Sequence, residues 1–252
     1  MDLVVDGLGG DGAALLALEE ALVRACPSRP LLRLWVNPPA VVVGRFQDVA
    51  REVALAACVA DGVAVLRRAS GGGTVYHDLG NLNVTLVLPC RATHTEDQLA
   101  TLLLSTLSGL RLPVERRQRG LFVGAAKLAG FASMQTGAGT LAHASLLVST
   151  DAAAVGRYLT PVPATTSPRD SHRAPVASLR DHGVDIDIAQ LAVTLCGRVA
   201  GLTRRWPSTA EWTAYEELLA RRYRDPGWHL TGTTKERAWT TTPVWASTAR
   251  WC

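Results

Sequence analysis

The chain has 252 residues, of which 48% are hydrophobic, and its 26 basic and 22 acidic side chains give a net charge of +4. This composition excludes a disordered chain and allows a sizeable core. The sequence has no apolar run of the roughly 18 residues that a membrane-spanning helix needs, and no secretory signal among its first residues, so we expect a cytoplasmic protein that does not bind membranes. It also has no basic run interleaved with aromatic residues, so we do not expect it to bind nucleic acid. The five cysteines lie far apart without Cys-x-x-Cys spacing, which argues against disulfides and against a zinc site.

The hydrophobic pattern predicts a helix first, which begins after Asp11, carries Leu15, Leu18 and Leu22 on one face and ends before Pro27. In chain order, the further predicted elements are strands at 31–36 and 40–46, a helix at 48–60, strands at 63–68 and 81–88, a helix at 95–110 that starts with a capping box, strands at 121–123, 126–134 and 141–149, and helices at 151–159, 187–202 and 209–224. The segment 160–175 contains four prolines and is predicted to be a loop.

This order of elements predicts an α+β fold with a mixed, largely antiparallel β-sheet flanked by helices. Residues 1–228 are expected to form one domain, and residues 229–252 a tail that leaves no room for an accessory domain. We assign no element to the tail, which is rich in Thr and Trp.

The most informative segment has three consecutive glycines, Gly71 to Gly73, behind a pair of arginines. Glycine has no Cβ and reaches positive φ easily, so consecutive glycine amides can turn toward one ligand and form an anion-binding nest. The loop lacks the Gly-x-x-x-x-Gly-Lys pattern of a P-loop, so a phosphate would be held by another architecture. The polar residues within reach of the same site are Arg68, which would add a forked cation, His77, Asp78, Asn81 and Asn83.

Lys127 stands among small and apolar residues, three positions before Gly130. Its side chain either snorkels to the surface or points into a pocket, and its small neighbours favour the pocket because they offer little surface to cover the stem. A lysine beside an anion nest can neutralise a phosphate and polarise an acyl carbonyl during acyl transfer, whereas a Schiff base would not explain the nest. His143 is either a core histidine or a site residue, and its neighbour Ser145 lacks the Gly-x-Ser-x-Gly elbow of a hydrolase.

Four blocks of residues together resemble the lipoate–protein ligase and lipoyltransferase family, in order and in spacing. The likeness extends from about Leu15 to Trp228. The blocks are Val42-Val43-Gly44-Arg45-Phe46-Gln47 with Glu52, then Arg67-Arg68-x-Ser70-Gly71-Gly72-Gly73-x-Val75-Tyr76-His77-Asp78-x-Gly80-Asn81, then Lys127-x-x-Gly130-x-Ala132, and last His143-x-x-x-Leu147-x-x-x-Asp151.

The resemblance implies a catalytic domain with the fold of biotin–protein ligases. Enzymes of the family attach lipoate or octanoate to a lysine of the lipoyl domains of 2-oxoacid dehydrogenases or of the glycine-cleavage H protein, and the ligases first use ATP with Mg²⁺ to form an acyl-adenylate. Lys127 would then be the catalytic residue that bridges the acyl carbonyl and the phosphate. The substrate-binding residues implied by the resemblance are Glu19, Arg68, Ser70 and His77 at the acyl pocket, Gly71, Gly72 and Gly73 at the acyl-phosphate junction, and Asn81, Gly130 and His143 nearby. None of them is expected to bind a metal as part of a metal centre.

The sequence departs from the family pattern on the nucleotide side. Arg119-Gly120 stands where the family usually has an Asn-Asp pair that contacts adenine and metal, and the loop from Gly137 to Thr140 has no basic residue. The acyl side is intact, so the resemblance supports acyl transfer more strongly than ATP activation. An octanoyltransferase would need a nucleophilic cysteine that the segment between Cys90 and Cys196 lacks, and the Gly-Arg-rich loop of a biotin ligase is missing.

The leading hypothesis is therefore an acyltransferase or ligase that attaches a lipoyl or octanoyl group to a lysine of lipoyl domains through an acyl-adenylate. The first alternative is a lipoyltransferase that lacks its own ATP-activation step or needs a separate accessory subunit. An alternative of another class is a non-catalytic binder of lipoyl domains, which would not require Lys127. The positive net charge suits an acidic lipoyl domain as the partner.

Overall fold

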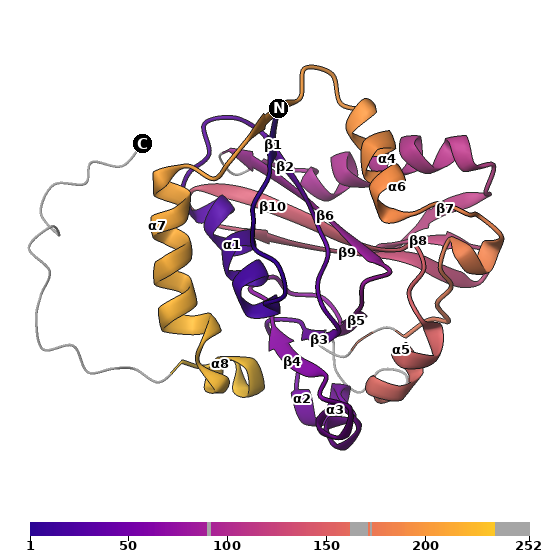
Figure 1. Ribbon diagram of the computed structural model, residues 1–252, viewed down its shortest axis with the longest axis horizontal. Helices are drawn as coiled ribbons and strands as arrows, with labels where there is room; N and C mark the ends of the chain where they lie inside the picture. The colour runs from indigo at the N-terminus through magenta and orange to yellow at the C-terminus, as the bar shows by residue number, and fades with distance from the viewer. Residues whose placement is uncertain (90–91, 162–170, 172, 235–252) are drawn as a thin grey trace, which may run out of the picture.

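The computed structural model describes residues 1–89, 92–161, 171 and 173–234, and its centre is an eight-stranded sheet (Figure 1). In this sheet β1 pairs in parallel with β2 and β11, and all other neighbouring strands are antiparallel. The mixed, largely antiparallel sheet of the prediction is thus confirmed. The strands, in their order across the sheet, are β11 (Thr203–Arg205), β1 (Asp2–Val4), β2 (Leu31–Trp35), β6 (Asn81–Pro89), β10 (Gly139–Leu147), β9 (Ala126–Gln135), β8 (Gly120–Val123) and β7 (Val114–Arg117).

The central strands divide their side chains between two faces, because successive residues of a strand point to opposite sides. On β6, Leu82 and Val84 join a core with helices α4 (Thr95–Leu107) and α6 (Ile188–Gly197). On the opposite face Val87 packs with α1 (Gly12–Arg24), and α7 (Thr209–Leu218) lies against α1 in turn. Figure 1 shows α1 beside α7, well apart from the pair α4 and α6. We call the face toward α1 the site face, because the polar residues Asn83 and Thr85 of β6 share it.

A second sheet of three strands carries the glycine segment. Strand β3 (Ala40–Val43) pairs in parallel with β4 (Ala64–Arg67) and antiparallel with β5 (Val75–His77). Residues 70–73, here called the glycine loop, connect β4 to β5. The loop lies directly over the large sheet, since a Cβ built on Gly72 would come within 3.2 Å of the Ala132 Cβ on β9. The small sheet is covered by α2 (Val49–Glu52), α3 (Leu55–Asp61) and α5 (Ala152–Tyr158).

The structure differs from the predicted elements where a distant partner decides the local conformation. The helix expected at 48–60 is divided into α2 and α3 at Val53, whose extended backbone bridges Leu159. The prediction of a capping box at Thr95 is wrong. The residue before α4 is His94, which has a left-handed backbone conformation and whose side chain does not cap the helix. The sequence pattern also misses β1, β5, β7 and β11, which have only three or four residues and therefore little periodicity.

The C-terminal part of the described chain is a π-helical turn (Leu219–Tyr223) followed by α8 (Pro226–Thr231). The expected boundary at residue 228 falls inside α8, because the Arg67 guanidinium donates to the carbonyl oxygens of Trp228, His229 and Leu230. Most of the predicted loop 160–175 and the tail from residue 235 lie outside the described residues. Within the described part of the chain, every helix is too short or too polar to cross a membrane.

Candidate active site

A cavity of about 730 Å³ lies between the glycine loop and the site face of the large sheet. Its lining combines apolar side chains, among them Leu16, Trp35 and Val42, with charged and polar groups. The ionisable residues among the described lining are Glu19, Arg68, His77, Arg117, Arg119, Lys127, His143 and Arg173. An apolar chain with an anionic end would match both parts of this lining.

The glycine loop is held by Arg68, which is buried beneath it. Its guanidinium donates to the carbonyl oxygens of Gly71 at 2.6 Å and Gly73 at 2.7 Å, and to that of Val42 at 3.1 Å. Burial lowers the pKa of Arg68 to about 10, so the side chain is charged at neutral pH. The sequence prediction of a forked cation that faces the ligand is therefore wrong, because carbonyl oxygens of the protein occupy the fork.

Arg68 has an indirect effect on a ligand through the backbone of the loop. Because it binds two carbonyl oxygens of the loop, the neighbouring amides are directed elsewhere, and Gly72 adopts a φ of +85° that other residues rarely adopt. Within the described part of the chain, no group accepts a hydrogen bond from the amides of Gly71, Gly72 or Gly73. These free amides are consistent with the glycine run, and the anion nest that it predicts stays a prediction.

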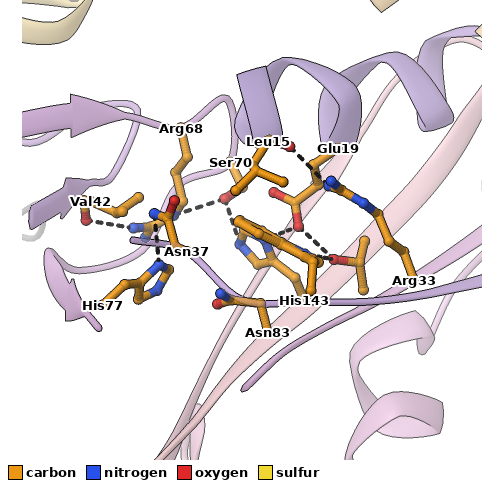
Figure 2. A network of polar contacts seen from close by, with 12 residues as sticks. Leu15, Glu19, Arg33, Asn37, Val42, Arg68, Ser70, His77, Asn83 and His143 are labelled. Carbon is orange, nitrogen blue, oxygen red and sulfur yellow. Dashed lines mark hydrogen bonds and ion pairs between the residues drawn. The ribbon is translucent and has the colours of Figure 1, made fainter. Parts of the chain in front are cut away.

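A buried hydrogen-bond chain connects helix α1 to the loop (Figure 2). The Glu19 carboxylate lies 2.9 Å from His143 Nδ1 and accepts from the Thr85 hydroxyl at 2.6 Å. Because a carboxylate only accepts, Nδ1 carries a proton and donates to Glu19, and on the other side of the ring Nε2 is hydrogen-bonded to the Ser70 hydroxyl at 2.8 Å. Ser70 Oγ in turn accepts from Arg68 Nε at 3.0 Å. Burial would raise the pKa of Glu19, but the charge of His143 and the hydrogen bonds from His143 and Thr85 outweigh it and lower the pKa.

His77 and Asn81 also lie at the site, but in different ways. His77 lines the cavity with its Nδ1 3.4 Å from the Asn37 amide nitrogen, and burial together with the charges of Arg68 and His143 lowers its pKa to about 3. It is therefore neutral at physiological pH. Asn81 is buried below the lining, where it donates to Asn83 at 3.1 Å and accepts from Ser145 at 2.6 Å. The structure thus gives Asn81 a supporting position, whereas the sequence predicts a substrate-binding residue.

Lys127 reaches the site face because of an irregularity in strand β9. Leu121 and Phe122 of β8 pair with Ala129 and Lys127, so Leu128 is an extra residue, a β-bulge, and packs into the same core as Ala129. In a regular strand Lys127 would share the face of Ala129 and point into that core. The bulge reverses this, and Lys127 lines the cavity.

Two glycines make room for the Lys127 stem. Gly120 and Gly130 are paired across β8 and β9, and a Cβ on them would lie 2.8 Å and 3.4 Å from the Lys127 Cε. Burial, and then the positive charge of Arg173, lower the pKa of Lys127. No described residue forms an ion pair or a side-chain hydrogen bond with the ammonium group, which is therefore available to a ligand.

The structure brings most of the predicted site residues to one cavity. The lining includes Glu19, Arg68, Gly72, Gly73, His77, Lys127, Gly130 and His143, while Ser70, Gly71 and Asn81 lie behind it. The sequence analysis missed Thr85, which fixes Glu19, and Arg173, which lies beside Lys127 on the partly described segment after α5. The polar residues at alternate positions of β6, Asn81, Asn83 and Thr85, could have indicated Thr85. No local pattern marks Arg173.

Comparisons with known proteins place the chain in one family. The model of the lipoyl protein ligase A/B catalytic domain matches residues 11–199. An Aeropyrum pernix protein provisionally named lipoate-protein ligase A is 39% identical over 166 residues, which cover 63% of this chain and 62% of that protein.

Two solved structures are also similar. The bi-partite lipoate protein ligase of Thermoplasma acidophilum, studied with its E2 lipoyl domain, superposes with a TM-score of 0.79 at 26% identity over 94% of this chain and 98% of that one. A lipoate-protein ligase A bound with ATP has a TM-score of 0.76 at 26% identity over 91% and 98% of the two chains. The matches to the first curated relatives cover 62%, 48% and 52% of their lengths, so the chain spans about half to three fifths of those proteins.

Proposed function

We propose that this chain, which belongs to the family of the lipoyl protein ligase A/B catalytic domain, transfers a lipoyl or octanoyl group from an acyl-adenylate to a lysine of a lipoyl domain. The observation that carries the proposal is one cavity lined both by Lys127, whose ammonium group has no partner among the described residues, and by Gly72 and Gly73, whose amides are free within the same part of the chain. These are the groups that acyl transfer from a phosphoric anhydride requires, because negative charge develops on both the acyl oxygen and the leaving phosphate.

In this reaction the neutral amine of the acceptor lysine attacks the acyl carbon. A carbon–nitrogen bond forms, the bond between the acyl carbon and the phosphate oxygen breaks, AMP leaves with the electron pair, and the amine loses one proton. The amides of Gly72 and Gly73 would donate to the oxygens at the acyl-phosphate junction, and the Lys127 ammonium would stabilise the charge on the departing phosphate. The neutral His77 and the apolar lining would hold the acyl chain.

The chain of hydrogen bonds from Glu19 would keep the loop in the required conformation. Arg68 directs the loop amides, Ser70 fixes Arg68, and the carboxylate of Glu19 fixes the His143 ring that is hydrogen-bonded to Ser70. Catalytic amides that are already oriented need no reorganisation as the charge develops. We therefore assign Arg68, Ser70 and Glu19 to positioning and Lys127 to catalysis.

A second question is whether this chain forms the acyl-adenylate itself from ATP. A structure similar to this chain holds ATP, so activation of lipoate by ATP in the same site is one possibility. The site offers few ligands for Mg²⁺, which the family implies. Glu19 is the one carboxylate in the described lining, and it already accepts two hydrogen bonds. Mg²⁺ prefers several oxygen ligands, and the described residues contain no cluster of three potential metal ligands. The residues present do not fit a resident magnesium site.

The runner-up is a lipoyltransferase that receives a preformed acyl-adenylate or relies on a separate subunit. A similar structure is described as a bi-partite ligase, which supports a division of the reaction between two chains. The acceptor proposed here is a lipoyl domain, such as the E2 lipoyl domain of that system, and an acidic surface on it would suit the net charge of +4. We propose the H protein of glycine cleavage as a second acceptor of the same kind.

Intact-mass measurement of an apo-lipoyl domain tests the proposal. The domain is incubated with the protein and lipoate, with and without ATP, and in parallel with synthetic lipoyl-AMP. An adduct in all complete mixtures means a ligase, and an adduct from lipoyl-AMP alone means a transferase without activation. Lys127→Ala is the test variant and Arg116→Ala the matched control, because Arg116 is paired with Asp97 outside the cavity. No adduct in either mixture, or equal rates for wild type and Lys127→Ala, would overturn the enzyme assignment.

A further inference from the structure

The cavity has a buried end and an open end, and Phe46 lies at the open end. The apolar residues Leu16, Trp35 and Val42 belong to one core cluster and line the buried end, where each is at most 6% exposed. Phe46 lines the same cavity but is 65% exposed. An acyl chain enclosed at the buried end would not need an aromatic ring at the surface, so Phe46 requires a different explanation.

The backbone around Phe46 is held firmly in place. The Gln47 amide donates to the carbonyl oxygen of Gly44 at 3.1 Å, which closes a tight turn with Phe46 inside it. The buried Arg67 guanidinium donates to three carbonyl oxygens of the same turn, those of Gly44, Arg45 and Gln47. The ring is therefore presented to solvent from a fixed backbone, and a partner that packs against it loses little free energy to ordering of the turn.

The ring of Phe46 also lies beside the glycine loop. A Cβ built on Gly71 would lie 3.8 Å and 3.9 Å from two carbon atoms of the ring. The Arg45 amide donates to the carbonyl oxygen of Ser70 at 2.8 Å, which joins the turn to the loop. Because successive Cα atoms are about 3.8 Å apart, the ring lies within roughly 10 Å of the Gly72 amide.

We propose that Phe46 is a docking contact for the acceptor protein, and that its ring packs against apolar surface beside the target lysine of the lipoyl domain. The inference rests on the proposed function and adds a place where the acceptor binds. A lysine side chain extends about 6 Å from its Cα, so the acceptor backbone must come that close to the acyl carbon. A folded domain at this distance contacts the open end of the cavity. Aromatic side chains are enriched in such interfaces, and Phe46 is the exposed aromatic ring in the described lining there.

Steady-state transfer from synthetic lipoyl-AMP tests the contact, with the apo-lipoyl domain as the varied substrate and intact mass as the readout. We expect Phe46→Ala to raise the KM for the domain by about five- to thirtyfold, as is typical when an aromatic interface residue is truncated, and to change kcat by less than about twofold. Phe46→Leu keeps apolar area and should lose less. Val193→Ala is the matched control and should match wild type, because Val193 is 73% exposed on α6, on the opposite side of the large sheet.

A second measurement separates docking of the acceptor from binding of the nucleotide. Calorimetric titration with octanoyl-sulfamoyl-adenosine, a stable analogue of the acyl-adenylate, gives the affinity of the site without the acceptor. The Kd of wild type and of Phe46→Ala should agree within about twofold, since the ring is expected to contact the acceptor and not the adenylate.

Two results would overturn the inference. One is a KM for the lipoyl domain that is the same in Phe46→Ala and wild type. The other is a Kd for the analogue that weakens as much as the KM rises, which would place the ring against the adenosine. Transfer by wild type combined with either result refutes only the docking contact. No transfer by wild type, from lipoyl-AMP or from lipoate with ATP, refutes the proposed function and this inference with it.

Discussion

Replacement of Gly120 by alanine should disable Lys127 without any change to the lysine itself. A Cβ at position 120 would lie 2.8 Å from the Lys127 Cε, 2.8 Å from the Phe122 Cε2 and 3.0 Å from the Ala129 carbonyl oxygen. Carbon atoms in contact are normally about 3.5–4.0 Å apart. The lysine stem and the phenyl ring must therefore each retreat by roughly 1 Å, because the backbone oxygen cannot.

The size of the effect follows from that displacement. An overpacked position costs about 1–3 kcal/mol of unfolding free energy, and a displacement of about 1 Å in a catalytic group can reduce the rate about a hundredfold. We expect Gly120→Ala to lower kcat for acyl transfer by about ten- to hundredfold. Gly130→Ala is the matched control, because its Cβ would meet the same lysine at 3.4 and 3.5 Å, which is close to ordinary contact. It should cost less than about threefold in rate.

A double-mutant cycle measures whether the loss passes through the lysine. Kinetics of transfer from lipoyl-AMP and urea denaturation are recorded for Gly120→Ala in the wild-type and Lys127→Ala backgrounds. If the methyl group acts by displacing Lys127, Gly120→Ala should lower the residual activity of the Lys127→Ala protein by less than about twofold. The reasoning is refuted if the two substitutions multiply in full, or if Gly120→Ala keeps the wild-type rate and stability.

Three further predictions concern the residues that support the loop. Glu19→Ala leaves the His143 Nδ1–H and the Thr85 hydroxyl without their acceptor, so urea denaturation should show that the free energy of unfolding falls by about 3–5 kcal/mol. Glu19→Gln keeps an acceptor oxygen and should lower it by less, and equal losses for the two variants would contradict this. The pKa of His77 is lowered from 6.5 to about 3, so the unfolded chain binds a proton there that the folded chain does not, and stability should fall as the pH decreases from 6.5 toward 3. The dependence should be shallower in His77→Gln, and denaturation at pH 7, 6 and 5 measures it. Arg67→Lys loses the guanidinium that donates to six carbonyl oxygens, so the free energy of unfolding should fall by more than about 1 kcal/mol. A smaller drop in urea denaturation would show that α8 does not need this contact.

Local sequence was sufficient for the features that depend on near neighbours. Helix α1 and strand β6 are predicted within a few residues, because their apolar periodicity is long and regular. The glycine run predicts a nest, and the loop has free amides, because positive φ and close approach are properties of glycine itself. The α+β class follows from the order of such elements.

Features that depend on a partner in space were not accessible in this way. Val53 interrupts the expected helix because its partner is Leu159, and nothing near Val53 indicates that bridge. Arg68 was expected to face the ligand, but it binds the carbonyl oxygens of its own loop. Which groups satisfy a buried guanidinium depends on the path of the folded backbone, since any carbonyl oxygen can accept.

Lys127 illustrates both sides of this division. The sequence by itself identified the lysine, because an isolated cation among small residues is costly unless it serves a site. It did not determine the side of the sheet on which the lysine lies. Strand periodicity alone places Lys127 with Ala129 in the core, and only the bulge at Leu128 turns it to the cavity. The pairing of β9 with β8 decides that bulge, and because side chains alternate with a period of two, one extra residue moves a charge from one face to the other.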